Sequence, residues 1–135
     1  MKTPYLILVV IVLVASAFLY LNLGSPQPEG FVNLTAEEAQ ANLSVAHDVQ
    51  IIDIRTPAEY VDGHLEGAVN IDFYSKTFVD ELKKLDPEKR YFIYCRTGNR
   101  SSNALRKMDG LGFTHVWHLK NGIVDWQRSG LPLVR

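Results

Sequence analysis

The sequence predicts an α/β domain with a mainly parallel central sheet of about five strands, flanked by helices on both faces. One N-terminal hydrophobic helix precedes it. Between residues 31 and 135, short β-branched or aromatic runs alternate with segments of helical periodicity. Such alternation implies right-handed crossovers between parallel strands. The uncharged stretch of residues 5–23 predicts the leading helix.

Each element of the domain follows from its local pattern. Thr35 and Glu38 form a capping box at the start of one helix. Pro87 ends a second helix, and Gly112 suits the end of a third. The β-branched run at residues 49–54 is typical of a strand buried on both faces. The expected strands are residues 31–34, 49–54, 67–71, 91–94 and 115–119, and the expected helices are residues 35–43, 76–85, 101–111 and 122–127, with a connection at residues 56–63 that has room for one helical turn.

The uncharged N-terminal stretch is long enough to cross a bilayer, which requires about 20 residues. A cleaved signal peptide is the alternative, because Ala15-Ser16-Ala17 has the small-x-small form of a cleavage site. Cleavage there would leave an apolar stub at the new N-terminus, so we favour an uncleaved anchor. A buried core helix fits least well, because the segment is apolar on all sides.

The chain therefore divides into a membrane anchor or signal segment (residues 1–24), a linker (25–30) and one domain (31–135). Lys2 precedes the apolar stretch, and the first cation after it is Arg55. By the positive-inside rule the N-terminus stays in the cytoplasm and the domain is translocated. We expect a domain held at the membrane through residues 5–23 on the extracytoplasmic side, or a secreted or periplasmic domain if the leader is cleaved.

Composition excludes several classes of protein. The 14 Lys and Arg nearly balance the 15 Asp and Glu, which argues against a general nucleic-acid binder. A single cysteine forms neither an intrachain disulfide nor a Cys-rich zinc site. His115 and His118 are three apart on an expected strand and so face opposite sides. We predict no metal and no cofactor.

The single cysteine, Cys95, stands where a catalytic group is expected. It ends a predicted strand, and ligands of parallel sheets bind beyond the carboxyl ends of the strands. Gly98 allows the following loop to curl its N–H groups into an anion nest, and the helix expected from Ser101 adds a positive dipole end. Arg96 and Arg100 add two charges, and together these features favour a reactive thiolate. The alternative, a small buried core cysteine, explains none of them.

Three blocks of sequence resemble the rhodanese (sulfurtransferase) family. The loop from Cys95 to Ser101 resembles that family's active-site loop. The resemblance covers residues 31–135 in the family's order and departs from it at Asn121, where many members have Gly. The other matching segments are residues 53–55, 59–60, 63–68 and 70–71 upstream and residues 119–122, 126 and 130–132 downstream.

The resemblance implies a sulfurtransferase that works through a Cys95 persulfide. The donor would be a small sulfur-containing anion such as thiosulfate, and the acceptor would be cyanide or a thiol, including the thiol of a protein. A thiolate that already exists needs no partner base. The implied substrate-binding residues are those of the loop: Arg96, Thr97, Gly98, Asn99, Arg100 and Ser101.

Among the two arginines, Arg96 is the expected contact with the donor, since guanidinium suits oxyanions. Arg100 could share that role or hold the loop by pairing with Asp53 or Glu59. Asp53, Arg55 and Glu59 are expected to support the loop, with Arg55 and Glu59 as an ion pair. His64 is expected to be a hydrogen-bonded turn residue.

Two other functions use a cysteine of this kind. Cysteine-dependent phosphatases place an arginine six positions after the cysteine, but here that position is Ser101 and Arg100 stands five positions after. The loop is thus one residue too short, and no aspartate is clearly placed as a general acid. The second rival is a membrane-tethered persulfide-relay or binding module without free turnover. A relay would use cyanide poorly and a specific thiol well.

Overall fold

The computed structural model describes residues 3–22 and 28–135, and within the first helix it describes the side chains of residues 7–16. The expected hydrophobic helix is present as α1 (Thr3–Asn22), and its apolar side chains from Ile7 to Val14 are exposed. Across the described ranges, no helix is both long enough and apolar enough to cross a membrane. The anchor at residues 5–23 stays a prediction from the sequence. Leu23 and residues 25–27 of the predicted linker lie outside the described residues.

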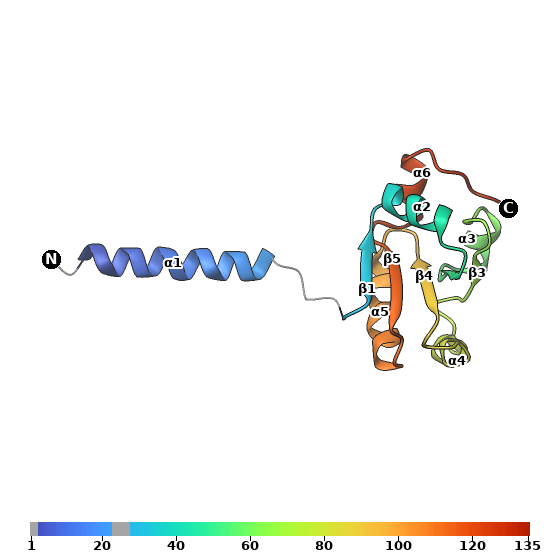
Figure 1. Ribbon diagram of the computed structural model, residues 1–135, viewed down its shortest axis with the longest axis horizontal. Coiled ribbons are helices and arrows are strands. Elements are labelled where there is room, and N and C mark those ends of the chain that lie inside the picture. Colours follow the sequence, from blue (N-terminus) through green and yellow to red (C-terminus); the bar gives the residue numbers. More distant parts are fainter. Residues whose placement is uncertain (1–2, 23–27) are drawn as a thin grey trace.

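The predicted parallel sheet is confirmed. Its strands lie in the order β1-β5-β4-β2-β3, which places β4 at the centre (Figure 1). Every neighbouring pair is parallel. The five strands are β1 (Phe31–Leu34), β2 (Val49–Asp53), β3 (Val69–Asn70), β4 (Arg90–Tyr94) and β5 (His115–Leu119).

Helices cover both faces of the sheet, as predicted. Along β4, Tyr91 and Ile93 share one core with α4 and α5, whereas Phe92 and Tyr94 share the other with α2 and α6. Cys95 continues the first set, so its side chain lies on the α5 face. The helices are α2 (Ala36–Val45), α3 (Pro57–Val61), α4 (Phe78–Lys83), α5 (Asn99–Gly110) and α6 (Gly122–Arg128).

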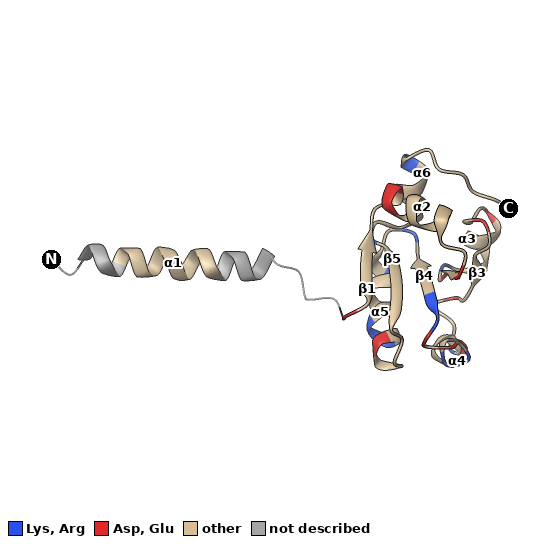
Figure 2. Cartoon of the chain, viewed as in Figure 1, with Lys and Arg blue, Asp and Glu red and all other residues tan. Residues whose placement is uncertain are grey.

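Helix termini carry charges that suit the helix dipole. The first turn of α2 contains Glu37 and Glu38, and the last turn of α6 contains Arg128 (Figure 2). The predicted capping box is present, with the Glu38 N–H donating to Thr35 Oγ1 and the Thr35 N–H donating to the Glu38 carboxylate. Such charges and caps stabilise the ends of the helices.

Several elements differ from the sequence prediction, and β3 spans Val69–Asn70 rather than residues 67–71. β2 is not buried on both faces throughout: Val49 to Ile51 are only half-buried, because β3 has two residues and pairs only with the end of β2. α4 starts at Phe78 rather than at residue 76, since Ser75 and Thr77 hydrogen bond to each other instead. α5 starts two residues early, at Asn99.

Candidate active site

The loop after β4 wraps around the sulfur of Cys95. The backbone N–H of Gly98 donates to Cys95 Sγ at 3.1 Å, and Ser101 Oγ lies 3.3 Å from the same sulfur. Only 1% of Cys95 is exposed. The sulfur of the predicted nucleophile is therefore surrounded by backbone N–H and hydroxyl groups. It lies at the carboxyl edge of the sheet, where α5 begins.

Two glycines allow this loop to pack against the connection from β5 to α6. Gly98 has φ 100°, and a Cβ there would lie 2.0 Å from the Lys120 carbonyl oxygen. Gly122 has φ 69°, and a Cβ there would lie 2.2 Å from the Arg96 carbonyl oxygen. Asn121, where the sequence departs from the family, has φ −104°, which any residue adopts. The departure therefore leaves this contact intact.

The environment of Cys95 favours the thiolate. Burial raises the pKa of the Cys95 thiol, but hydrogen bonds from the Ser101 hydroxyl and from the N–H groups of Ser101, Gly98 and Thr97 outweigh it and lower the pKa overall. The thiolate is the nucleophilic form of cysteine. The site thus presents a shielded sulfur anion that is held by backbone and hydroxyl donors.

A hydrogen-bond chain leads from the buried sulfur to the exposed Asn33 on β1. Ser101 Oγ lies 2.7 Å from His118 Nε2, and His118 Nδ1 lies 2.8 Å from Asn33 Oδ1. The sequence pattern predicts a strand at His118 but no function for its side chain. The parallel register of β1 and β5 sets Asn33 directly beside His118, and no local pattern reveals the pairing of strands 85 residues apart.

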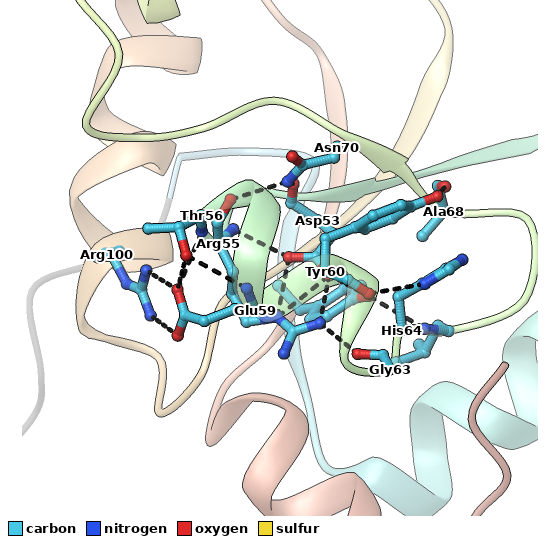
Figure 3. A network of polar contacts seen from close by, with 12 residues as sticks. Asp53, Arg55, Thr56, Glu59, Tyr60, Gly63, His64, Ala68, Asn70 and Arg100 are labelled. Atoms are coloured by element: carbon cyan, nitrogen blue, oxygen red, sulfur yellow. Dashed lines mark hydrogen bonds and ion pairs between the residues drawn. The ribbon is translucent and has the colours of Figure 1, made fainter. Parts of the chain in front are cut away.

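A second network braces the loop that precedes α3 (Figure 3). The Arg55 guanidinium donates to both carboxylate oxygens of Asp53, at 2.6 to 3.1 Å, and to the Gly63 carbonyl at 2.6 Å. The Tyr94 hydroxyl donates to Asp53 Oδ2 at 2.7 Å. Asp53 and Arg55 are both buried. They hold the fold beneath the site and do not reach the sulfur.

Arg100 forms a two-pronged ion pair with Glu59. Both N–O distances are 2.8 Å, and the Arg100 guanidinium also lies over the Tyr74 ring. The hydrogen bond from Arg100 holds the pKa of Glu59 at about 2 against the opposing effect of burial. Of the two roles considered for Arg100, the geometry corresponds to holding the loop, with Glu59 rather than Asp53 as partner.

The expected ion pair between Arg55 and Glu59 is wrong. Thr56 and Glu59 form a second capping box at the start of α3, which turns the Glu59 carboxylate back along the helix toward Arg100. Arg55 reaches Asp53, two residues earlier, instead. His64 is the expected turn residue: its Nδ1 lies 2.9 Å from the Tyr60 carbonyl, and its ring stacks on Tyr60 (Figure 3).

Arg96 lies beside a cavity at the same edge of the sheet. It is exposed, and in the part of the chain that the structure describes it forms no ion pair. Arg96, Arg55, Glu59 and Asp62 supply the charged lining of this cavity of about 290 Å³, and Ile123 supplies part of its apolar wall. Thr97 and Asn99, also in the predicted site, are exposed at the rim of the loop.

A buried thiol with a lowered pKa, held in an anion nest at the carboxyl edge of a parallel sheet, is typical of a class of cysteine-dependent α/β proteins. A model of the rhodanese-like domain family matches residues 35–129, and the chain belongs to that family. The resemblance inferred from three sequence blocks is thereby confirmed.

Individual relatives agree with this assignment. A sulfurtransferase of Allochromatium vinosum is 32% identical over 101 residues, which cover 75% of this chain and 92% of that protein. A tRNA uridine(34) hydroxylase of Buchnera aphidicola is 34% identical over 114 residues, but the match covers 36% of its length. The crystal structure of a rhodanese-related protein from Thermoplasma volcanium has a TM-score of 0.66 at 27% identity and covers 76% of this chain and 96% of that one.

Proposed function

We propose that this protein is a sulfurtransferase that carries a sulfane sulfur on Cys95, from an anionic donor such as thiosulfate to cyanide or a thiol. The observation that carries the proposal is the nest around Cys95 Sγ, where the Gly98 N–H and the Ser101 hydroxyl contact a buried sulfur whose pKa is lowered. A site that stabilises a thiolate also suits the anionic persulfide that follows it.

The first half-reaction needs only the Cys95 thiolate. Its sulfur attacks the outer sulfur of thiosulfate, a new sulfur–sulfur bond forms, and the bond to the sulfonate sulfur breaks. Sulfite leaves with the bonding electron pair, and Cys95 becomes a persulfide with an anionic terminal sulfur. Arg96 is the cation that supports donor binding, because it is exposed at the cavity and has no ion pair among the described residues.

The second half-reaction returns the enzyme to its starting state. The acceptor attacks the terminal sulfur, the bond between the two sulfurs of the persulfide breaks, and Cys95 leaves as a thiolate. The two steps together form a ping-pong cycle. Arg100 keeps the loop in place through Glu59, and so acts by positioning.

The rivals weighed from sequence are a phosphatase and a persulfide relay or binding module. Arg100 is engaged by Glu59 and by the Tyr74 ring, which leaves it poorly placed to cradle a phosphate. A relay uses the same persulfide and differs only in its acceptor. The extracytoplasmic location stays a prediction from the sequence.

The test is the intact mass of the purified full-length protein before and after thiosulfate. We expect a gain of one sulfur atom that cyanide removes, and no gain in the Cys95→Ser variant. A reduced, alkylatable Cys95 that gains no sulfur from thiosulfate would contradict this donor. Release of phosphate from an aryl phosphate would instead support the phosphatase. Slow loss of the sulfur to cyanide with fast loss to a protein thiol would identify a relay.

A further inference from the structure

Three buried side chains form a hydrogen-bond chain in which each donor hydrogen can be assigned to an acceptor. Cys95, Ser101 and His118 are 1%, 0% and 2% exposed, so solvent does not reach the thiol directly. The Ser101 hydroxyl has one hydrogen but three acceptors in range: Cys95 Sγ at 3.3 Å, the Gly98 carbonyl at 3.1 Å and His118 Nε2 at 2.7 Å. Which acceptor receives it depends on the protonation of His118.

Asn33 determines which nitrogen of His118 carries hydrogen. Its Oδ1 faces Nδ1 at 2.8 Å and can only accept, so Nδ1 must donate. In neutral His118, Nε2 then has a lone pair and takes the Ser101 hydrogen. The lone pairs of Ser101 Oγ face the sulfur, where a protonated Cys95 thiol can donate to them. Every group in this neutral state is satisfied.

Loss of the thiol proton to solvent alone would break this arrangement. If the Ser101 hydroxyl kept donating to His118 Nε2, its oxygen lone pairs would face a sulfur anion. If it turned to donate to the sulfur, the buried Nε2 would have no hydrogen-bond partner. Both outcomes are costly, since an unsatisfied buried polar group costs about 1–3 kcal/mol. A state with a thiolate and an imidazolium avoids the cost, because Nε2–H then donates to Ser101 and Ser101 donates to the sulfur.

We propose that His118 holds the proton of the Cys95 thiol, which Ser101 relays and Asn33 anchors. The S–H bond breaks as a hydrogen joins Ser101 Oγ, and the original hydroxyl hydrogen moves from Oγ to His118 Nε2. The thiolate and the imidazolium form together, with no net loss of a proton. His118 is thus a positioning residue that acts on the nucleophile through Ser101.

The surroundings make the two ionisations interdependent. Burial lowers the pKa of His118 to about 4, so an imidazolium in this site requires an anion nearby. The thiolate on the other side of Ser101 supplies that anion. From α5, the Arg100 guanidinium acts on Cys95, whereas β1 contributes only the neutral Asn33. Within the described residues, no carboxylate hydrogen bonds to Cys95, Ser101 or His118.

The inference rests on the proposed role of Cys95 as nucleophile, and its test needs no sulfur donor. The ultraviolet absorbance of the thiolate is titrated with pH in the reduced full-length protein. We expect His118→Gln to lower the thiolate fraction at neutral pH, with a fall of about tenfold in the ratio of thiolate to thiol, which corresponds to a shift of one pH unit in the titration. Asn33→Asp should raise the fraction, because a carboxylate stabilises the imidazolium. His115→Gln, on the same strand but exposed, is the matched control and should leave the curve unchanged.

The imidazole nitrogen-15 shifts of His118 provide the second readout. We expect a protonated ring beside the thiolate and a neutral ring in Cys95→Ser at the same pH. A neutral ring in both proteins would overturn the proposal, as would identical thiol titrations of His118→Gln and the parent. If His118→Gln does not fold, Asn33→Asp still decides, because Asn33 is exposed on the edge strand β1. Failure here with normal sulfur loading would leave the proposed function intact.

Discussion

Replacing Glu59 with Gln isolates the charge that holds the active-site loop. Gln serves in a capping box as Glu does, so the contacts at the start of α3 are kept while the ion pair with Arg100 is lost. The variant therefore separates electrostatics from helix capping.

The expected magnitude follows from the pKa of Glu59. The hydrogen bond from Arg100, which is the largest effect, and those from Thr56 together lower it from 4.5 to about 2 against the opposing effect of burial, which corresponds to about 3 kcal/mol of stability at neutral pH. Solvent screens the Glu59 side chain, which is 29% exposed, and Gln keeps the Thr56 contacts, so the expected loss in the variant is about 2 kcal/mol. A lowered pKa stabilises the fold above the unfolded value, and the stability is lost as pH falls from 4.5 toward about 2.

The assay is urea unfolding of the parent and of Glu59→Gln between pH 7 and pH 3. We expect the variant to be less stable by about 2 kcal/mol at pH 7, with the difference shrinking as the pH falls below 4.5. Glu38→Gln is the matched control, since Glu38 caps α2 in the same way but forms no ion pair within the described residues. A loss that stays constant across this pH range would refute the reasoning.

Three further predictions concern the loop, the core and the donor. Gly98→Ala should destabilise the fold strongly, because the new Cβ would lie 2.0 Å from the Lys120 carbonyl oxygen. Gly110→Ala is the control, since a Cβ there meets open space and should be neutral or stabilising. Thermal unfolding of the two variants tests this difference. Tyr94→Phe should cost about 1–3 kcal/mol in urea unfolding by removing a buried donor to Asp53, yet leave sulfur loading intact. Arg96→Ala should slow sulfur loading at low thiosulfate and recover at high thiosulfate; equal rates at every concentration would remove Arg96 from donor binding.

Much of the fold was predictable because its signals are local. The alternation of strands and helices requires parallel crossovers, and Thr35 with Glu38 marks a helix start within four residues. The strand β5 was predicted with its exact bounds, residues 115–119. The predictions of strand burial and of helix bounds were wrong where neighbouring elements decide them. The short β3 leaves the start of β2 half-buried, and a turn around Ser75 shortens α4.

In the candidate site, too, local features were predictable and long-range contacts were not. Cys95, Gly98 and the start of a helix are close together in the chain, so the sequence by itself determined that a cysteine in an anion nest follows a central strand. Only the tertiary structure decided that Glu59 pairs with Arg100 and that Asn33 meets His118 beside the sulfur. These partners lie 41 and 85 residues apart. Their contacts depend on strand order and loop placement, which arise from packing of the whole domain and leave no trace in any local pattern.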